Sequence, residues 1–224
     1  MTSETKDRAY VPALGQHWMT PFYDSAIALT TREATWRTAL IGLVDPHGED
    51  VILDIGCGTG SLIAAMKAAS PETQIIGLDP DPEVLEIAKA KARSRGHKVE
   101  FVQGFGDELL EKVGNRPINK IVSSLVFHQV PLDGKRSTLQ ATFDLLPEDG
   151  ELFIADFGEQ RTPLMRFLFK TVQRLDGYEF TQPNADGCLP VILTDVGFSA
   201  VQEALVVPTI VGSISLYSAQ KGGM

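Results

Sequence analysis

The chain has 224 residues, of which 43% are hydrophobic and 22% are charged, as is ordinary for a globular domain with one sizeable core. The net charge of −9 argues against a large phosphate-binding surface, so we expect no nucleic-acid partner. No apolar run is long enough to span a membrane, and the N-terminus lacks the apolar segment of a signal peptide. We therefore expect one cytoplasmic domain over residues 1–224, without a membrane span. The two cysteines, Cys57 and Cys188, are expected to be reduced thiols, and we predict no metal site.

Residues 1 to about 20 are polar and irregular, and an aromatic cluster of His17, Trp18, Phe22 and Tyr23 lies at the end of this segment. A helical pattern follows to about residue 44, where the sequence Asp45-Pro46 breaks it. Strands and helices then alternate, which predicts a parallel sheet with helices on both faces. The predicted strands are 51–55, 74–79, 99–103, 118–126 and 151–156, and the predicted helices are 60–69, one that begins at Pro82, and 134–146.

The pattern changes after Asp156. Two further helices are predicted over residues 161–178 and 185–196, and two closing strands over 199–207 and 210–219. A short link that contains Pro208 joins these strands, which is typical of an antiparallel hairpin.

Three glycines follow the first strand, at positions 56, 58 and 60, and a helical segment begins directly after them. Glycines let the backbone turn sharply and let a bulky cofactor approach closely. The second strand ends in Asp79, about 20 residues further on, where a carboxylate can accept hydrogen bonds from ribose hydroxyls. This combination predicts a nucleotide-binding βαβ unit.

The spacing of the glycines distinguishes between cofactors. A dinucleotide fingerprint requires G-x-G-x-x-G, but Ser61 follows Gly60 here and the pattern is G-x-G-x-G. The run from Asp54 to Gly60 resembles the first motif of the class I S-adenosylmethionine (SAM)-dependent methyltransferases. This resemblance implies an α/β fold of three layers, with a Rossmann-like, seven-stranded, mostly parallel sheet, an antiparallel terminal hairpin and SAM as the cofactor.

The resemblance also implies which residues bind SAM. Asp79 would hold the ribose, and Asp54 would either reach the ammonium group through water or accept hydrogen bonds from loop amides. The full predicted set is Asp54, Gly56, Cys57, Gly58, Gly60, Asp79, Pro80, Gly104, Phe105, Gly106, Ser123 and Ser124.

The position that recognises adenine has two alternatives. If Gly104 aligns with the glycine of the family's Gly-Asp-Ala segment, Phe105 takes the place of the acid and would pack on the adenine ring. If Gly106 aligns with it, Asp107 supplies the acid. The sequence leaves both alignments open.

The fourth strand ends in Ser123-Ser124-Leu-Val-Phe-His128, a form familiar from methyltransferases of the ubiquinone and menaquinone type. His128 is a candidate general base, because imidazole titrates near neutral pH. The alternative is a structural histidine that is hydrogen-bonded beneath the floor of the site.

The methyl acceptor is expected to be a small molecule that is partly apolar or aromatic. Residues 1–45 would form a lid, and the insertion 157–185 would contribute to the acceptor pocket. Predicted acceptor-binding residues are Trp18, Tyr23, Phe127 and Arg166, with Arg161, Met165, Phe167, Phe169 and Tyr178 nearby in the sequence. A homodimer is a further hypothesis. Two alternatives stay open for the function, namely an NAD(P)-dependent oxidoreductase and a SAM-binding protein without catalytic activity.

Overall fold

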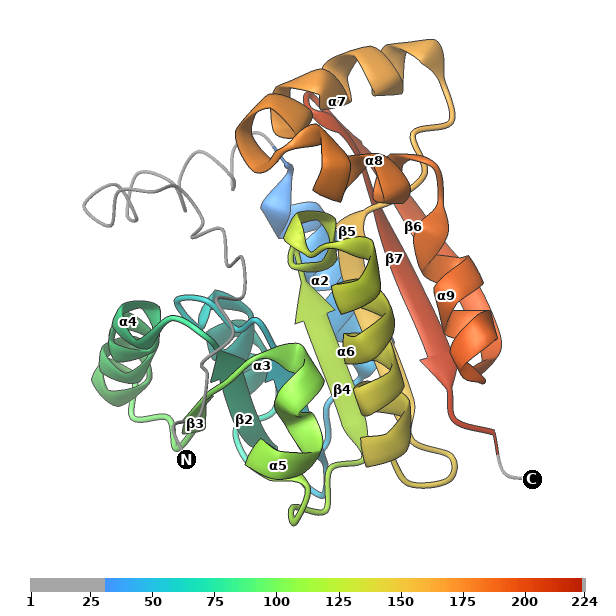
Figure 1. The fold of residues 1–224 in the computed structure, drawn as a ribbon. Helices are drawn as coiled ribbons and strands as arrows, with labels where there is room; N and C mark the ends of the chain where they lie inside the picture. Colours follow the sequence, from blue (N-terminus) through green and yellow to red (C-terminus); the bar gives the residue numbers. More distant parts are fainter. Residues whose placement is uncertain (1–30, 223–224) are drawn as a thin grey trace, which may run out of the picture.

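The computed structural model describes residues 31–222 and shows a central sheet between two layers of helices (Figure 1). The sheet has seven strands in the order β3-β2-β1-β4-β5-β7-β6. The strands are β1 (Val51–Ile55), β2 (Gln74–Asp79), β3 (Glu100–Gln103), β4 (Lys120–Ser124), β5 (Glu151–Phe157), β6 (Ser199–Thr209) and β7 (Gly212–Gln220). The first five strands are parallel, and β7 is antiparallel to β5 and β6. This arrangement confirms the predicted fold class.

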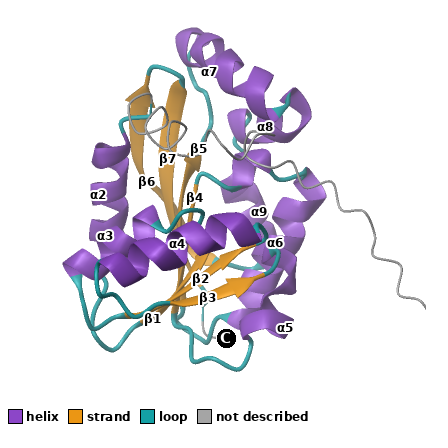
Figure 2. Ribbon diagram, turned by 90° about the vertical axis from the view of Figure 1, so that its left-hand side faces the viewer, coloured by secondary structure: helices purple, strands orange, loops and turns teal. Residues whose placement is uncertain are grey.

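Helices cover both faces of the sheet (Figure 2). Apolar side chains of α2 (Glu33–Val44), α3 (Ser61–Ala69) and α4 (Pro82–Ser94) form one core with one face of the strands. Side chains of α5 (Leu109–Val113), α6 (Leu132–Leu145) and α9 (Cys188–Val196) form a second core on the opposite face. The central strands are buried on both faces, so β1 consists of five buried residues in succession.

The segment after β5 forms three helices where two were predicted. These are α7 (Pro163–Asp176), α8 (Tyr178–Ala185) and α9. Gly177 separates α7 from α8 with a φ of 90°, and Gly187 separates α8 from α9 with a φ of 84°. Both angles lie in the left-handed region that favours glycine, so the two glycines mark the boundaries of α8, the helix that was not predicted.

The fourth strand is shorter than the predicted 118–126. It ends at Ser124, because Leu125 adopts a φ of 56° and the short 3₁₀ helix η3 (Phe127–Gln129) follows. A second helical region, η2 (Gly106–Glu108) with α5, was not predicted at all.

The predicted position of Pro208 in the hairpin link is wrong. Pro208 lies within β6, opposite Ser213 of β7, and the turn itself follows at Ile210 and Val211. Proline is tolerated there because β6 is an edge strand, where a missing N–H group interrupts no ladder. The pairing of β6 with β7 also contains two register shifts, and Ala200 lies in the first of them with a φ of 49°.

The strand order reverses direction between β1 and β4. In open α/β sheets, ligands bind beyond the carboxyl ends of the strands at such a switch point. The glycine loop after β1 and η3 after β4 both lie there. Among the described residues, no helix combines the length and the apolar character that crossing a membrane requires.

Candidate active site

A cavity of about 420 Å³ opens at the switch point, a volume within the range of small-molecule sites. Its walls come from the loops after the first four strands, from the end of β5, from α2 and α7, and from the hairpin turn. The residues that line it include Thr31, Trp36, Gly56, Cys57, Gly58, Thr59, Ser61, Asp79, Pro80, Gly104, Phe105, Gly106, Ser124, Phe127, His128, Phe157, Thr171, Val172, Leu175, Asp176 and Val211.

The glycine loop forms one end of this cavity. Gly56, Gly58 and Gly60 all have positive φ, at 68°, 52° and 73°. A Cβ atom on Gly56 would lie 2.3 Å from Cγ2 of Val126, whereas a Cβ atom on Gly58 would meet nothing within 4 Å. Gly56 is therefore required by the packing around it, while Gly58 faces open space in the cavity.

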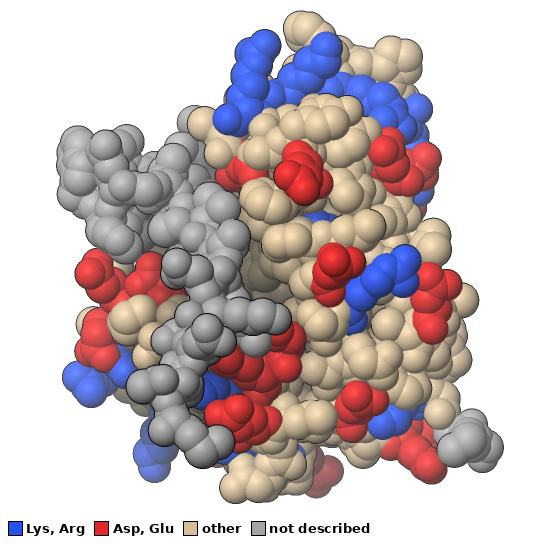
Figure 3. Space-filling view, viewed as in Figure 1, with Lys and Arg blue, Asp and Glu red and all other residues tan. Residues whose placement is uncertain are grey.

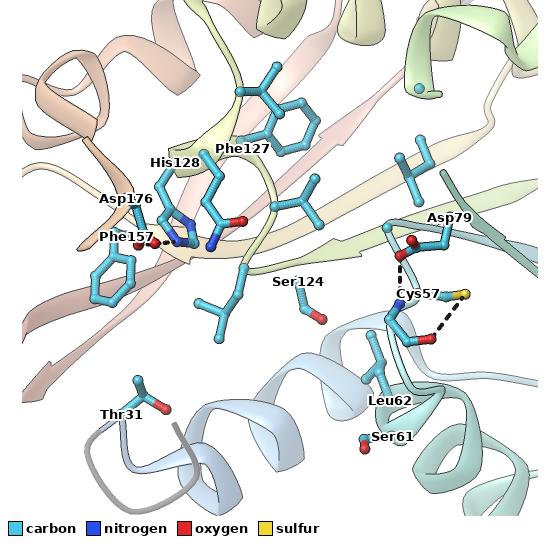
Figure 4. Close-up of a pocket in the computed structure, with 18 of the residues that line it drawn as sticks. Thr31, Cys57, Ser61, Leu62, Asp79, Ser124, Phe127, His128, Phe157 and Asp176 are labelled. Carbon is cyan, nitrogen blue, oxygen red and sulfur yellow. Dashed lines mark hydrogen bonds and ion pairs between the residues drawn. The ribbon is translucent and has the colours of Figure 1, made fainter. Parts of the chain in front are cut away.

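Asp79 lies beside this loop and is 8% exposed. Its Oδ2 accepts a hydrogen bond from the Gly58 amide at 2.9 Å (Figure 4). Its Oδ1 accepts one from the Asp81 amide at 3.0 Å. Each carboxylate oxygen has a second lone pair that remains able to accept. Burial raises the pKa of Asp79, and its two amide donors oppose that increase.

Asp54 lies beneath the loop, in β1, and is 1% exposed. Neither of its carboxylate oxygens has a hydrogen-bond partner among the described residues. Burial, followed by the nearby charge of Asp79, raises the pKa of Asp54 to about 8. No loop amide donates to this carboxylate, so the structural role considered for Asp54 in the sequence is not observed.

Two hydroxyl groups complete this end of the cavity. Thr59 and Ser61 line it, and the Lys91 ammonium on α4 donates to both hydroxyl oxygens, at 3.0 Å and 2.9 Å. The two hydroxyl oxygens lie 3.3 Å apart, within hydrogen-bond distance of each other.

The loop after β3 holds both candidates for the adenine position. Gly104, Phe105 and Gly106 line the cavity, whereas Asp107 is exposed and lies outside its lining. The structure thus brings Phe105, and not Asp107, to the cavity wall.

The opposite end of the cavity is largely apolar. It is formed by Phe127 of η3, Phe157 of β5, Val172 and Leu175 of α7, and Val211 of the hairpin turn. Figure 4 shows that His128 and Asp176 lie on this side of the cavity, away from Asp79 and Cys57.

His128 is held between two carboxylates. Its Nδ1 lies 2.7 Å from Oδ1 of Asp156, and its Nε2 lies 3.5 Å from Oδ2 of Asp176. Burial is the largest influence and acts to lower the pKa of His128, but the charges and hydrogen bonds of the two carboxylates together outweigh it. They raise the pKa to about 9. At neutral pH the ring is therefore a cation that donates hydrogen bonds, and it holds no free lone pair with which to accept a proton.

Several residues that the sequence singled out lie elsewhere. Ser123 is fully buried and donates to the Ile55 carbonyl, so only its neighbour Ser124 lines the cavity. Arg166 is exposed on α7 and pairs with Asp186. Asp54 and Gly60 are not part of the cavity lining. Trp18 and Tyr23 fall outside the described residues.

Two acidic residues that surround His128 were not predicted. Asp156 is the carboxylate at the end of the fifth apolar strand, and that position was a usable signal, because Asp79 ends the second strand in the same way. Asp176 is the last residue of α7, 48 positions beyond His128, and no local pattern connects the two.

The parallel sheet with a reversed β7, the glycine loop and a cavity at the switch point define a nucleotide-binding fold of the Rossmann-like type. Comparison with known proteins narrows this class. The model of the family described as "Methyltransferase domain" matches residues 52–150. The chain thus carries a class I SAM-dependent methyltransferase domain, and the cofactor of that domain is SAM, as predicted.

Individual relatives agree with this assignment. A demethylmenaquinone methyltransferase of Lactobacillus johnsonii is 25% identical over 159 residues, which cover 69% of this chain and 64% of that protein. A release factor glutamine methyltransferase of Deinococcus radiodurans is 40% identical over 73 residues, which cover 33% of this chain and 25% of that protein. The chain thus spans only part of the length of these curated relatives.

A solved structure also shares the fold. The magnesium protoporphyrin IX methyltransferase of Synechocystis, determined with S-adenosylhomocysteine (SAH) bound, superposes with a TM-score of 0.63 at 19% identity. The match covers 85% of this chain and 84% of that one.

Proposed function

We propose that the protein transfers the methyl group of SAM to a small molecule that is partly apolar or aromatic. The observation that carries this proposal is the division of the cavity into two ends. One end presents Asp79, the glycine loop and the Thr59 and Ser61 hydroxyls, and the other presents apolar side chains around the pair of His128 and Asp176.

The residues at the first end fit SAM. Asp79 retains acceptor capacity for ribose hydroxyls, and Phe105 offers an aromatic face to adenine. The unpartnered carboxylate of Asp54 lies nearby and fits a positively charged ammonium group. Residues without a side chain, such as Gly58, leave room for close approach of the ligand.

When bound, SAM supplies a methyl group on a sulfonium leaving group. The chain's own task is then to position the acceptor against that methyl group and to exclude water. Phe127, Phe157 and Val172 would provide apolar walls for a ring or hydrocarbon portion. Such walls favour a small partly apolar acceptor over a flexible polar one.

His128 takes the role of a charged donor in this proposal, in place of the general base considered in the sequence analysis. Because its Nδ1–H group is held by Asp156 at 2.7 Å, the group that would donate to an oxygen atom of the acceptor is Nε2–H, whose contact with Asp176 is longer, at 3.5 Å. Asp176, whose side chain is 21% exposed at the cavity wall, is the carboxylate placed to accept a proton from an acceptor O–H group.

Two segments would close the cavity. Thr31 and Trp36 line it from the N-terminal region within 1–45, and Thr171 and Leu175 line it from the insertion 157–185. These contacts support the lid and the acceptor-pocket assignments for the two segments, which we retain as part of the proposal.

Relatives act on acceptors of more than one kind. The names of two of the proteins above specify demethylmenaquinone and magnesium protoporphyrin IX, and the name of the third specifies a release factor. The apolar end of the cavity favours the small-molecule class for this chain, and the net charge of −9 disfavours RNA.

Two measurements test the proposal. Calorimetric titration should show binding of SAM and SAH and none of NADH, and NADH binding without SAM binding would exclude methyl transfer. Methyl-labelled SAM should then label a phenol, quinol, thiol or small acid from a panel, and not a peptide or RNA. Labelling confined to peptide or RNA would refute the small-molecule assignment, and SAM binding without transfer to any acceptor would favour a non-catalytic role.

A further inference from the structure

The helix α7 presents three different faces. Phe169 and Val172 are buried against the rest of the domain. Leu164, Phe167 and Leu175 are each about two thirds exposed, at 65%, 66% and 66%. A third set, formed by Arg166, Lys170 and Arg174, is basic and exposed.

The exposed apolar residues form a continuous line, which we call the α7 stripe (Leu164, Phe167 and Leu175). Steps of three and four residues connect Leu164, Phe167, Thr171 and Leu175, so these side chains lie above one another along one side of the helix. Ile210, in the hairpin turn, is also 65% exposed, and that turn lies against α7, since a Cβ atom on the following Gly212 would approach Phe169 at 3.3 Å. The apolar surface is thus concentrated at one end of the molecule.

The basic residues flank this stripe. Figure 3 shows Lys and Arg side chains gathered over α7 at the top of the molecule. Arg166 is paired with Asp186, while no ion pair in the described part of the chain involves Lys170 or Arg174. Lys170 lies 5.9 Å from the ring of Phe167. In a chain with a net charge of −9, this local excess of positive charge runs against the overall balance.

We propose that the α7 stripe docks the protein onto an anionic lipid surface. An interfacial helix of this kind inserts its apolar side chains among the acyl chains while adjacent basic residues contact lipid phosphates. A second copy of the chain fits this face less well. In a two-fold contact, Lys170 and Arg174 of one copy would lie against the same residues of the other, at a cost in repulsion.

Docking on this face brings the cavity close to the lipid. Thr171 and Leu175 belong to the same side of α7 and also line the cavity. An acceptor dissolved in a bilayer would thus reach the apolar end of the cavity beside the docked helix. This last consequence rests on the proposed function, whereas the docking itself does not.

Vesicle sedimentation of the full chain tests the docking. We expect binding to vesicles that contain phosphatidylglycerol, weaker binding at high salt, and little binding to pure phosphatidylcholine. Charge reversal in K170E/R174E should weaken the binding on the order of 30-fold or more, since each basic residue near an anionic surface contributes roughly fivefold. L164S/F167S should reduce it as well, including the part that persists in high salt.

A control lies on α4, which carries the exposed Ile87 and the basic residues Lys89 and Arg93. The variant I87S/K89E/R93E should bind anionic vesicles like the unmodified chain. Unchanged SAH affinity in every variant verifies folding without reference to methyl transfer.

Three outcomes would overturn the proposal: equal binding to neutral and anionic vesicles, no binding to either, or an equal loss in the α4 variant. A dimer in sedimentation velocity that L164S/F167S dissociates, without vesicle binding, would assign the stripe to a second copy instead.

Discussion

The imidazole of His128 and the carboxylate of Asp156 form a buried ion pair, with 2.7 Å between Nδ1 and Oδ1. The other oxygen of Asp156 accepts a hydrogen bond from the backbone amide of Phe127 at 2.6 Å. One carboxylate therefore fixes both the charge of the ring and the path of η3 along the cavity wall.

Replacement of His128 by glutamine should destabilise the protein by ~3 kcal/mol at pH 6, because Asp156 would then be buried without a cation. The pKa of His128 is about 9 in the folded protein and about 6.5 in an unfolded chain. The stabilisation is thus complete below pH ~6.5 and is lost as the pH rises through about 9. Chemical denaturation of both proteins from pH 6 to 10 should show the difference shrinking. A difference that stays constant would mean that the ring is neutral when folded.

The rate of methyl transfer should also depend on the protonation of His128, if the protonated ring donates a hydrogen bond to the acceptor. We expect kcat/KM to fall above pH ~9. Asp176→Asn should lower kcat/KM, because it removes the proposed proton acceptor, and should also move this limb to lower pH, because one of the two carboxylates that raise the pKa of His128 is lost. An activity that instead rises with pH through the neutral range would identify His128 as a base.

Replacement of Asp79 by asparagine should weaken binding of SAH and of adenosine alike, by roughly 10- to 100-fold, since both ligands carry the ribose and charge-assisted hydrogen bonds contribute ~1.5–3 kcal/mol. Asp107→Asn is the control, because this carboxylate is exposed and outside the cavity lining. Calorimetric titration measures both. A loss in Asp107→Asn as large as in Asp79→Asn would place the adenine on Asp107 and not on Phe105.

The Asp54→Asn variant should be more stable than the unmodified protein at high pH and should bind SAH more weakly. The folded state raises the pKa of Asp54 to about 8, so the native protein retains a proton that the unfolded chain releases near pH ~4. Stability therefore falls as the pH rises from about 4 to about 8, and an amide removes this dependence. At pH 9 we expect a melting temperature that is a few degrees higher. An unchanged melting temperature together with unchanged SAH affinity would contradict both parts.

Alanine substitutions should have different effects at Gly56 and Gly58. Gly56→Ala should be strongly destabilising, because its Cβ atom would overlap Val126. Gly58→Ala should cost only ~1–2 kcal/mol for its left-handed backbone, yet reduce SAH affinity, since the new methyl group points into open space at the cavity. Thermal melting with SAH titration distinguishes them. Similar melting temperatures for the two variants would contradict the packing argument at Gly56.

Much of this architecture could be predicted because it is encoded locally. The runs around Val51–Ile55 and Asp79 combine buried-strand composition with a glycine turn, and these features need no distant partner to be interpreted. Asp176 could not be predicted to approach His128, because that approach depends on how α7 packs over β5 and β7. The helix predicted over 161–178 ran past Gly177 for a related reason, since only the backbone angle of this glycine shows that α7 ends before it.

The irregular pairing of β6 has a consequence for assembly. This outer strand carries two register shifts and Pro208, and the opposite outer strand, β3, has only four residues. Bulges, proline and short length all prevent a free strand edge from recruiting another strand. Both borders of the sheet are therefore poor templates for strand addition. Within the described residues, the sheet is thus guarded against edge-to-edge pairing of two copies.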